Sequence, residues 1–194
     1  YRLPNRFTPK DVIVDVGAHI GVFAVSCLLR GAGKVICYEP DDENYALLQQ
    51  NLAPFGDRAE CHPDALWPAC EGNAYLRKRE PQFTAMSHCV SPYGEAVPSV
   101  SLQDVLDCAH VVRLLKLDCE GAEWPGLFRA QEVDVYTTQE IIGEWHHKMR
   151  VPTWPGEWTT EALKERLSRW GFQVEVAAGT MPELCSHLFA RRAA

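Results

Sequence analysis

The sequence predicts an α/β fold built on a largely parallel sheet. Two short β-branched runs, 11–16 and 34–39, are each followed by a helix-like stretch. This alternation of strand and helix is typical of βαβ units, which form parallel sheets. The chain has 194 residues, of which 46% are hydrophobic and 23% charged, and these values are ordinary for a globular domain with a full core. We therefore expect one domain spanning residues 1–194.

The first half of the chain gives the clearest element signals. Gly17 ends the first strand, and the helix after it ends at Gly31. Pro40 ends the second strand, and Asp41 or Asp42 can cap a second helix. The apolar residues of the first helix recur on one face, as expected for a helix packed on a sheet; they are Ile20, Phe23, Ala24, Cys27 and Leu28.

The remaining elements give weaker signals. We expect strands at 58–62, 111–118 and 133–142, a hairpin of 73–79 with 83–90, and a final antiparallel strand pair of 172–176 with 187–190. We expect helices at 101–106 and 163–170, and a short helix that begins after Glu120.

Charge and cysteine content restrict the partners that we expect. Lys and Arg total 19 against 26 Asp and Glu, which gives a formal net charge of −7 and argues against nucleic acid as a partner. No apolar run approaches the roughly 20 residues that span a bilayer. The 8 cysteines are scattered without C-x-x-C spacing, so we interpret them as reduced thiols in a cytoplasmic protein.

The densest chemical signal lies where the first strand turns into the first helix. Asp15, Gly17 and Gly21 form the pattern D-x-G-x-x-x-G at this turn, and ligands of open α/β sheets bind at the carboxyl ends of strands. The dinucleotide pattern G-x-G-x-x-G would need glycine at His19 and Val22, so NAD and FAD are disfavoured.

Glu39 ends the second strand, 24 residues after Asp15. An acidic residue at about this offset accepts hydrogen bonds from ribose hydroxyls, so the turn and Glu39 together suit a nucleoside without a diphosphate. The alternative is that Gly17 and Gly21 serve only tight packing and that Glu39 is a solvated strand end.

Three segments resemble the FkbM-type methyltransferases, a class I S-adenosylmethionine-dependent family: 15–21, 38–40 and 115–123. The resemblance extends from about Pro9 to Ala190 and includes 99–104 and 144–146. It implies a Rossmann-like class I methyltransferase fold: a mostly parallel seven-stranded sheet with a reversed last strand and helices on both faces. It also implies S-adenosylmethionine as cofactor and, usually, O-methylation. Many family members carry Asn where this chain has His19.

The resemblance also implies a role for each matching residue. The turn residues would surround the methionine part of the cofactor, Glu39 would hold the ribose, and Pro40 and Asp41 would shape the adenine side. Asp64 and Ala65 match the region that meets the adenine edge, and Asp118 would lie beside the sulfonium and the acceptor. The turn residues are Asp15, Gly17, Ala18, His19 and Gly21.

Transfer to a hydroxyl also needs a base, and the catalytic candidates are Asp118, Glu120 and His146. We interpret His146 either as this base, with its pKa near the working pH, or as a simple loop histidine. Glu120 and Glu123 also suit plain helix N-terminal electrostatics. No spacing is diagnostic of a metal site, so we predict none, with a cluster of Asp118, Glu120, Glu144, His146 and His147 as the alternative.

The functional expectation is therefore S-adenosylmethionine-dependent O-methylation of a small-molecule acceptor such as a sugar or a polyketide. N-methylation and a cofactor-binding module without turnover are the alternatives.

Overall fold

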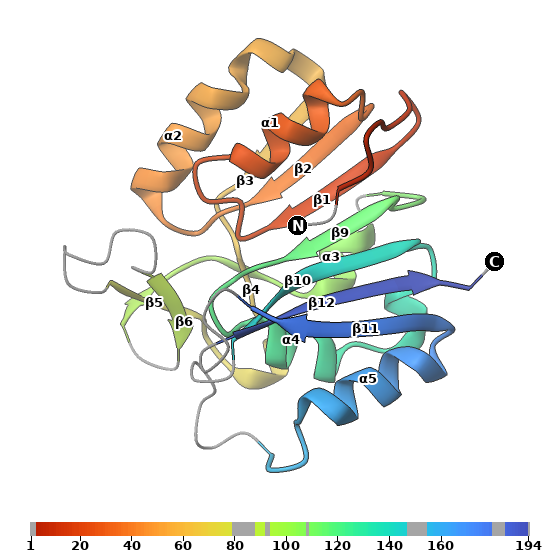
Figure 1. Cartoon of the computed structure of the whole chain (residues 1–194). Helices are drawn as coiled ribbons and strands as arrows, with labels where there is room; N and C mark the ends of the chain where they lie inside the picture. The colour runs from red at the N-terminus through yellow and green to blue at the C-terminus, as the bar shows by residue number, and fades with distance from the viewer. Residues whose placement is uncertain are drawn as a thin grey trace.

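The computed structural model describes residues 3–78, 88–91, 94–107, 109–146, 155–179 and 185–193. Over this part of the chain, seven strands form the main sheet in the order β11-β12-β10-β9-β1-β2-β3. The pairs β1·β2, β1·β9, β2·β3 and β9·β10 are parallel, whereas β12 runs antiparallel to both β10 and β11. This confirms the mostly parallel sheet with a reversed last strand (Figure 1).

The first half of the chain folds largely as its sequence predicts. Its buried β-branched runs become central strands because parallel strands are covered on both faces. Asp41 caps the second helix, since its side chain accepts a hydrogen bond of 2.9 Å from the Asn44 N–H. The elements are β1 (Val12–Val16), α1 (Val22–Leu29), β2 (Lys34–Tyr38), α2 (Asp42–Leu52), a 3-10 helix (Ala53–Arg58) and β3 (Ala59–His62).

The second half supplies the rest of the main sheet and three further helices. In chain order, the elements of this half are α3 (Leu102–Asp107), β9 (Leu114–Leu117), α4 (Glu123–Arg129), a 3-10 helix (Glu132–Val135), β10 (Glu140–His146), α5 (Thr160–Arg169), β11 (Phe172–Ala178) and β12 (Cys185–Arg192). No helix in the described ranges is long and apolar enough to span a membrane.

Short strands between β3 and α3 form two small sheets. β4 (Ala65–Leu66) pairs in parallel with β8 (Ser99–Val100), and β5 (Tyr75–Lys78) pairs antiparallel with both β6 (His88–Ser91) and β7 (Glu95–Ala96). A 3-10 turn, Ala69–Glu71, precedes β5. Figure 1 shows β5 and β6 at the end of the main sheet toward which its parallel strands run. The expected hairpin of 73–79 with 83–90 is present as β5·β6; residues 79–87 lie outside the described ranges.

One expected strand is wrong in its first half. Residues 133–142 do not form a strand throughout, because Glu132–Val135 is a 3-10 helix and β10 begins only at Glu140. A capping box explains the difference: the Gln131 side chain accepts from the backbone of Asp134, whose own side chain accepts from the Gln131 N–H at 2.7 Å.

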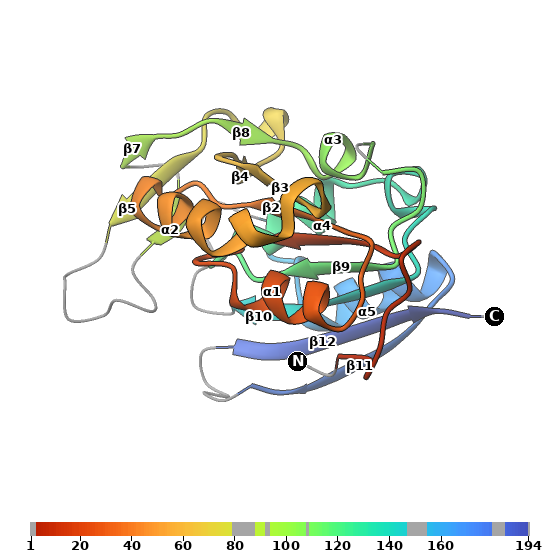
Figure 2. The same ribbon diagram turned by 90° about the horizontal axis from the view of Figure 1, so that it is seen from above.

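Helices cover both faces of the sheet, as predicted. One core contains α1 and α2 residues such as Ala24, Cys27 and Leu48, packed on β1, β2 and β9. The opposite core contains α3, α4 and α5 residues such as Val105 and Leu163. Figure 2 shows the same arrangement from above, with α1 and α2 near β1 and β2.

Candidate functional site

The turn after β1 is locked onto two neighbouring strands. The N–H groups of Gly17 and Ala18 donate to the Tyr38 carbonyl at 2.9 and 3.0 Å. Gly17 has φ +74°, and a Cβ there would lie 1.9 Å from the Asp118 carbonyl oxygen. Gly21 has φ +88° and approaches Leu48, which a Cβ would meet at 2.7 Å. Gly17 is therefore required for the close approach of the turn to the residue after β9, whereas glycine is favoured at position 21 by its positive φ.

Glu39 links this turn to the end of β2. Its Oε2 accepts a hydrogen bond from the His19 N–H at 2.8 Å, and its Oε1 accepts one from the Asp41 N–H at 3.0 Å. His19 has φ +52°, a left-handed conformation that Asn and His adopt more readily than most residues. Burial raises the pKa of Glu39, while hydrogen bonds from the Asp41 and His19 N–H groups and the Asn44 side chain oppose the rise. Glu39 is 6% exposed, so the alternative of a solvated strand end is wrong.

The Lys116 side chain contacts the turn after β1 and the carboxylates on both sides of it. Its Nζ lies 2.9 Å from Asp15 Oδ1, 3.8 Å from Asp118 Oδ2, and donates to the Gly17 carbonyl at 2.8 Å. Burial acts to lower the pKa of Lys116, but the carboxylates of Asp15 and Asp118 outweigh it and raise the pKa above its usual value. Asp15 is fully buried, so its side chain supports the turn through Lys116.

A cavity of about 430 Å³ lies beside the turn, at the carboxyl ends of β1 and β9. Four of the residues expected to bind the cofactor line it: Gly17, Ala18, His19 and Asp118. Lys116 also lines it, together with Leu3, Val22, Phe23, Ser26 and Arg30. The lining therefore combines a backbone turn, apolar side chains and three charged side chains (Arg30, Lys116 and Asp118), a composition typical of small-ligand pockets.

The residues expected near the adenine have mixed placements. Asp41 is buried and caps α2, and Pro40 and Asp64 are half-buried. Ala65 is buried in β4, where its N–H donates to the Pro98 carbonyl at 2.9 Å. Ala65 therefore belongs to the small β4·β8 sheet.

The structure brings the three catalytic candidates together. His146 ends β10 and is 5% exposed. Its Nε2 lies 3.6 Å from Glu120 Oε2, 3.6 Å from Glu144 Oε2 and 3.9 Å from Asp118 Oδ1. Burial acts to lower the pKa of His146, but Glu123, followed by Glu120 and Asp118, raises it to about 10. These three carboxylates stabilise the protonated ring, so the pKa of His146 lies above the near-neutral value expected of a base.

Glu123 is a functional candidate that the sequence analysis missed. This first residue of α4 is fully buried, and its Oε1 lies 2.7 Å from His146 Nδ1. Its oxygens also accept the backbone N–H groups of Cys119 at 3.1 Å and Gly121 at 2.7 Å. The position alone suggested helix N-terminal electrostatics, and no local pattern indicates the contact with a residue 23 positions later.

The same cluster has atoms that could act as metal ligands. One such atom each from Asp118, Glu120 and His146 lies within 4.8 Å of the others, and Glu144 is close by. A protonated imidazole has no free lone pair, so a metal here would compete with the proton on His146. His147, the remaining member of the expected cluster, lies outside the described residues.

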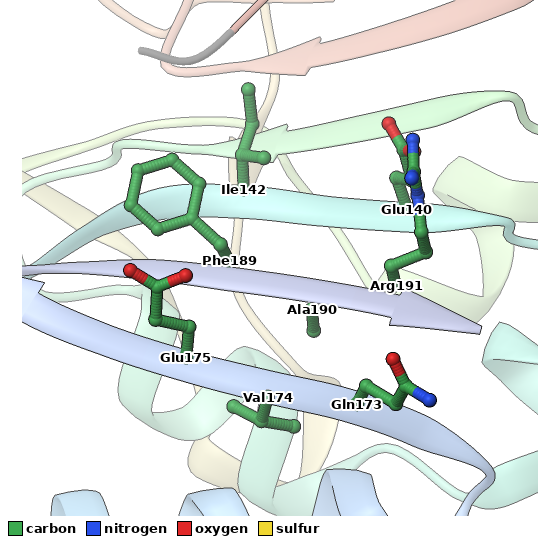
Figure 3. Close-up of a pocket in the computed structure, with 8 residues that line it drawn as sticks. All are labelled: Glu140, Ile142, Gln173, Val174, Glu175, Phe189, Ala190 and Arg191. Atoms are coloured by element: carbon green, nitrogen blue, oxygen red, sulfur yellow. The ribbon is translucent and has the colours of Figure 1, made fainter. Parts of the chain in front are cut away.

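A second cavity, of about 460 Å³, lies on the flat of the sheet (Figure 3). β10, β11 and β12 form its floor, and Glu140 pairs there with Arg191. Within the described ranges, its lining includes none of the predicted site residues. The candidate site is therefore the cavity at the strand ends.

Solved structures share this fold at low sequence identity. A protein from Listeria monocytogenes described as an S-adenosylmethionine-dependent methyltransferase has a TM-score of 0.59 at 12% identity, covering 99% of this chain and 94% of its own. An rRNA methylase from Streptococcus thermophilus gives 0.57 at 9%, covering 96% and 89%. A magnesium protoporphyrin IX methyltransferase from Synechocystis, with S-adenosylmethionine bound, gives 0.50 at 10%, covering 95% and 72%. No curated protein matches the sequence.

The expected partner assignment, a small-molecule acceptor with nucleic acid excluded, is wrong. The fold is shared with an rRNA methylase, so it is not restricted to enzymes that act on small molecules. The exclusion depended on the net charge of −7. Net charge describes the whole chain and not the surface around the site.

The fold, with its reversed last strand, is that of the class I methyltransferases. The family model described as the methyltransferase FkbM domain matches residues 15–174, which is more than half of the chain. The matched range includes the turn after β1, Glu39, and His146 with its four carboxylate neighbours Asp118, Glu120, Glu123 and Glu144. The chain therefore belongs to the FkbM methyltransferase family.

Proposed function

We propose that the chain binds S-adenosylmethionine in the cavity beside Gly17 and transfers its methyl group to a hydroxyl oxygen of an acceptor. The observation that carries the proposal is the position of His146. Its Nε2 faces Asp118 at 3.9 Å, and Asp118 also lines the cavity. A proton acceptor and a nucleoside-type turn thus meet at adjacent strand ends.

The residues around the cavity fit this cofactor. Glu39 accepts the His19 and Asp41 N–H groups and a hydrogen bond from the Asn44 side chain. A carboxylate has about four acceptor positions, so Glu39 retains one for a ribose hydroxyl. Asp118 and Glu120 provide negative charge beside the cavity, which favours a cationic group. When bound, the cofactor supplies an activated methyl group on a positively charged sulfur, so alignment is the main task of the protein.

The chain's own residues then handle the acceptor proton. A hydroxyl that gains a methyl group loses its proton, and His146 Nε2 accepts it once the ring is neutral. The carboxylates of Asp118, Glu120 and Glu123 stabilise the imidazolium that forms, as the raised pKa of His146 indicates. Lys116 restrains Asp118 from the opposite side at 3.8 Å.

Cofactor choice is tested by thermal unfolding. S-adenosylhomocysteine should raise the melting temperature through binding to the folded state, whereas NADH should not. Stabilisation by NADH alone would contradict the proposal.

Reaction type is tested with S-adenosylmethionine labelled in the methyl group. The chain is incubated with separate RNA, protein, lipid and metabolite fractions, and the labelled product is analysed by mass spectrometry. The proposal expects methyl on oxygen. It also expects His146→Ala to reduce the rate of labelling by about 10²- to 10⁴-fold while S-adenosylhomocysteine still stabilises the variant. Methyl found only on nitrogen would contradict O-methylation, and binding without any transfer would favour a module without turnover.

A further inference from the structure

Glu123 occupies an unusual place for a carboxylate. It is 0% exposed at the first residue of α4, and Trp124 and Pro125 beside it are also buried. A buried carboxylate is unfavourable unless it is hydrogen-bonded. A carboxylate needed only for helix N-terminal electrostatics could remain in water. Its burial against His146 therefore points to a more specific role.

The donors around Glu123 determine where the proton lies on His146. An ionised carboxylate only accepts hydrogen bonds. Glu123 receives them from the N–H groups of Cys119 and Gly121, and its Oε1 lies 2.7 Å from His146 Nδ1. Nδ1 must therefore carry a proton to make this contact. In the neutral ring the other nitrogen, Nε2, is then the one with a free lone pair.

The surroundings also fix the direction of the ring. The backbone of His146 is held because its carbonyl accepts the Trp124 indole N–H at 2.9 Å. On the Nε2 side the facing groups are Asp118, Glu120 and Glu144, all at 3.6–3.9 Å. These distances exceed a normal N–H···O hydrogen bond. Glu123 therefore makes the short contact to the ring, and Nε2 is directed toward the end of β9.

We infer that Glu123 is a positioning residue: it holds His146 as the Nδ1–H tautomer and directs Nε2 to the acceptor side of the site. The consequence for methyl transfer rests on the proposed function, whereas the tautomer itself does not. The arrangement follows the logic of a carboxylate that orients a catalytic histidine in hydrolases, in which removal of the carboxylate changes the tautomer.

The tautomer is measured by nitrogen NMR of the full chain labelled with ¹⁵N-histidine. As the pH rises toward the pKa of His146, the Nε2 resonance should move toward the value of an unprotonated ring nitrogen while Nδ1 stays near the protonated value. His146→Gln identifies the signal. Loss of the proton from Nδ1 instead of Nε2 in the wild-type chain would overturn the inference. This measurement does not require a variant of Glu123.

Matched variants separate position from charge. Glu123→Gln removes the carboxylate at Nδ1, whereas Glu120→Gln removes the same charge 3.6 Å from Nε2 and leaves the Nδ1 contact in place. We expect Glu120→Gln to keep the wild-type tautomer and Glu123→Gln to lose it. Circular dichroism and a cooperative urea unfolding transition show whether each variant remains folded. An unchanged tautomer in a folded Glu123→Gln variant would overturn the inference.

Kinetics complete the test. With an acceptor in hand, Glu123→Gln should reduce kcat by about 10²- to 10⁴-fold with little change in KM. A wild-type Nδ1–H tautomer together with methyl on nitrogen would leave the inference standing and reject the proposed O-methylation. Methyl on oxygen together with an Nε2–H tautomer would support the proposed O-methylation and reject the inference about Glu123.

Discussion

Lys116 and Asp15 form a buried ion pair, 2.9 Å apart, under the turn that borders the candidate cofactor cavity. The pair joins β9 to β1, and the Lys116 ammonium also donates to the Gly17 carbonyl. Its side chains are 5% and 0% exposed. The turn is therefore held in place by a charge pair that water does not screen.

The first prediction is that Lys116→Met destabilises the fold by about 3–5 kcal/mol, the effect of leaving one buried charge without its partner. Lys34→Met is the matched control, because Lys34 pairs with Glu60 at the surface, where both side chains are 38% exposed. Loss of such a surface pair should change stability by about 1 kcal/mol or less. Urea unfolding measures the free energy of unfolding of both variants. If Lys116→Met lowers it by as little as Lys34→Met does, the Lys116–Asp15 pair is not important for stability.

The second prediction is that Glu39→Gln weakens S-adenosylhomocysteine binding by about 1.5–3 kcal/mol, roughly 10- to 100-fold. The reason is that an amide has only one acceptor oxygen and cannot accept from a ribose hydroxyl while also accepting both the His19 and Asp41 N–H groups. Isothermal titration calorimetry measures the dissociation constant. Glu43→Gln, an exposed carboxylate in the first turn of α2, is the control. If the two variants bind equally well, Glu39 only supports the turn.

Much of the sheet could be predicted because its central strands are short β-branched runs with clear ends. The segment 11–16 has this form, and β1 follows it closely. The error at 133–142 arose because Val133 and Val135 suggested a strand, whereas the Gln131–Asp134 capping box starts a 3-10 turn there. Hydrogen bonds from side chains to the backbone can favour a turn where the apolar pattern favours a strand. The apolar pattern alone does not show which of the two will form.

The candidate site was predicted where residues end strands and missed where a contact depends on packing. Asp118 follows β9 and His146 is the last residue of the neighbouring parallel strand β10, so the rule that ligands bind at strand ends brought the two residues together. Glu123 reaches His146 only because the start of α4 is buried against β10. Burial by itself acts to lower the pKa of His146, and the carboxylates of Glu123, Glu120 and Asp118 outweigh it and raise the pKa. The sequence does not show which carboxylates surround the ring.

The third prediction separates the acceptor side from the cofactor side. His146→Ala should reduce turnover by about 10²- to 10⁴-fold and leave S-adenosylhomocysteine affinity nearly unchanged, because His146 does not line the cavity. Asp118→Ala should weaken both, because Asp118 lines the cavity and lies within 3.9 Å of His146. Calorimetry and initial rates measure the two quantities. Loss of cofactor affinity in His146→Ala would place this residue in the cofactor site.

The last prediction concerns pH. The folded-state pKa of His146 is raised to about 10 from the usual 6.5, so the ring is protonated at neutral pH and gains its free lone pair as the pH rises. If neutral His146 is the base, kcat/KM should increase from neutral toward alkaline pH and should not decline there while the chain stays folded.

Glu120→Gln tests this assignment, because Glu120 is one of the carboxylates that raise the pKa of His146. Removing a charge 3.6 Å from Nε2 should move the rising limb of the pH profile to lower pH by about one unit or more. Glu43→Gln, which alters an exposed carboxylate on α2, should leave the limb in place. A limb that stays fixed in Glu120→Gln would mean that a group other than His146 takes the proton, and Asp118 would then be the next candidate because it also lines the cavity.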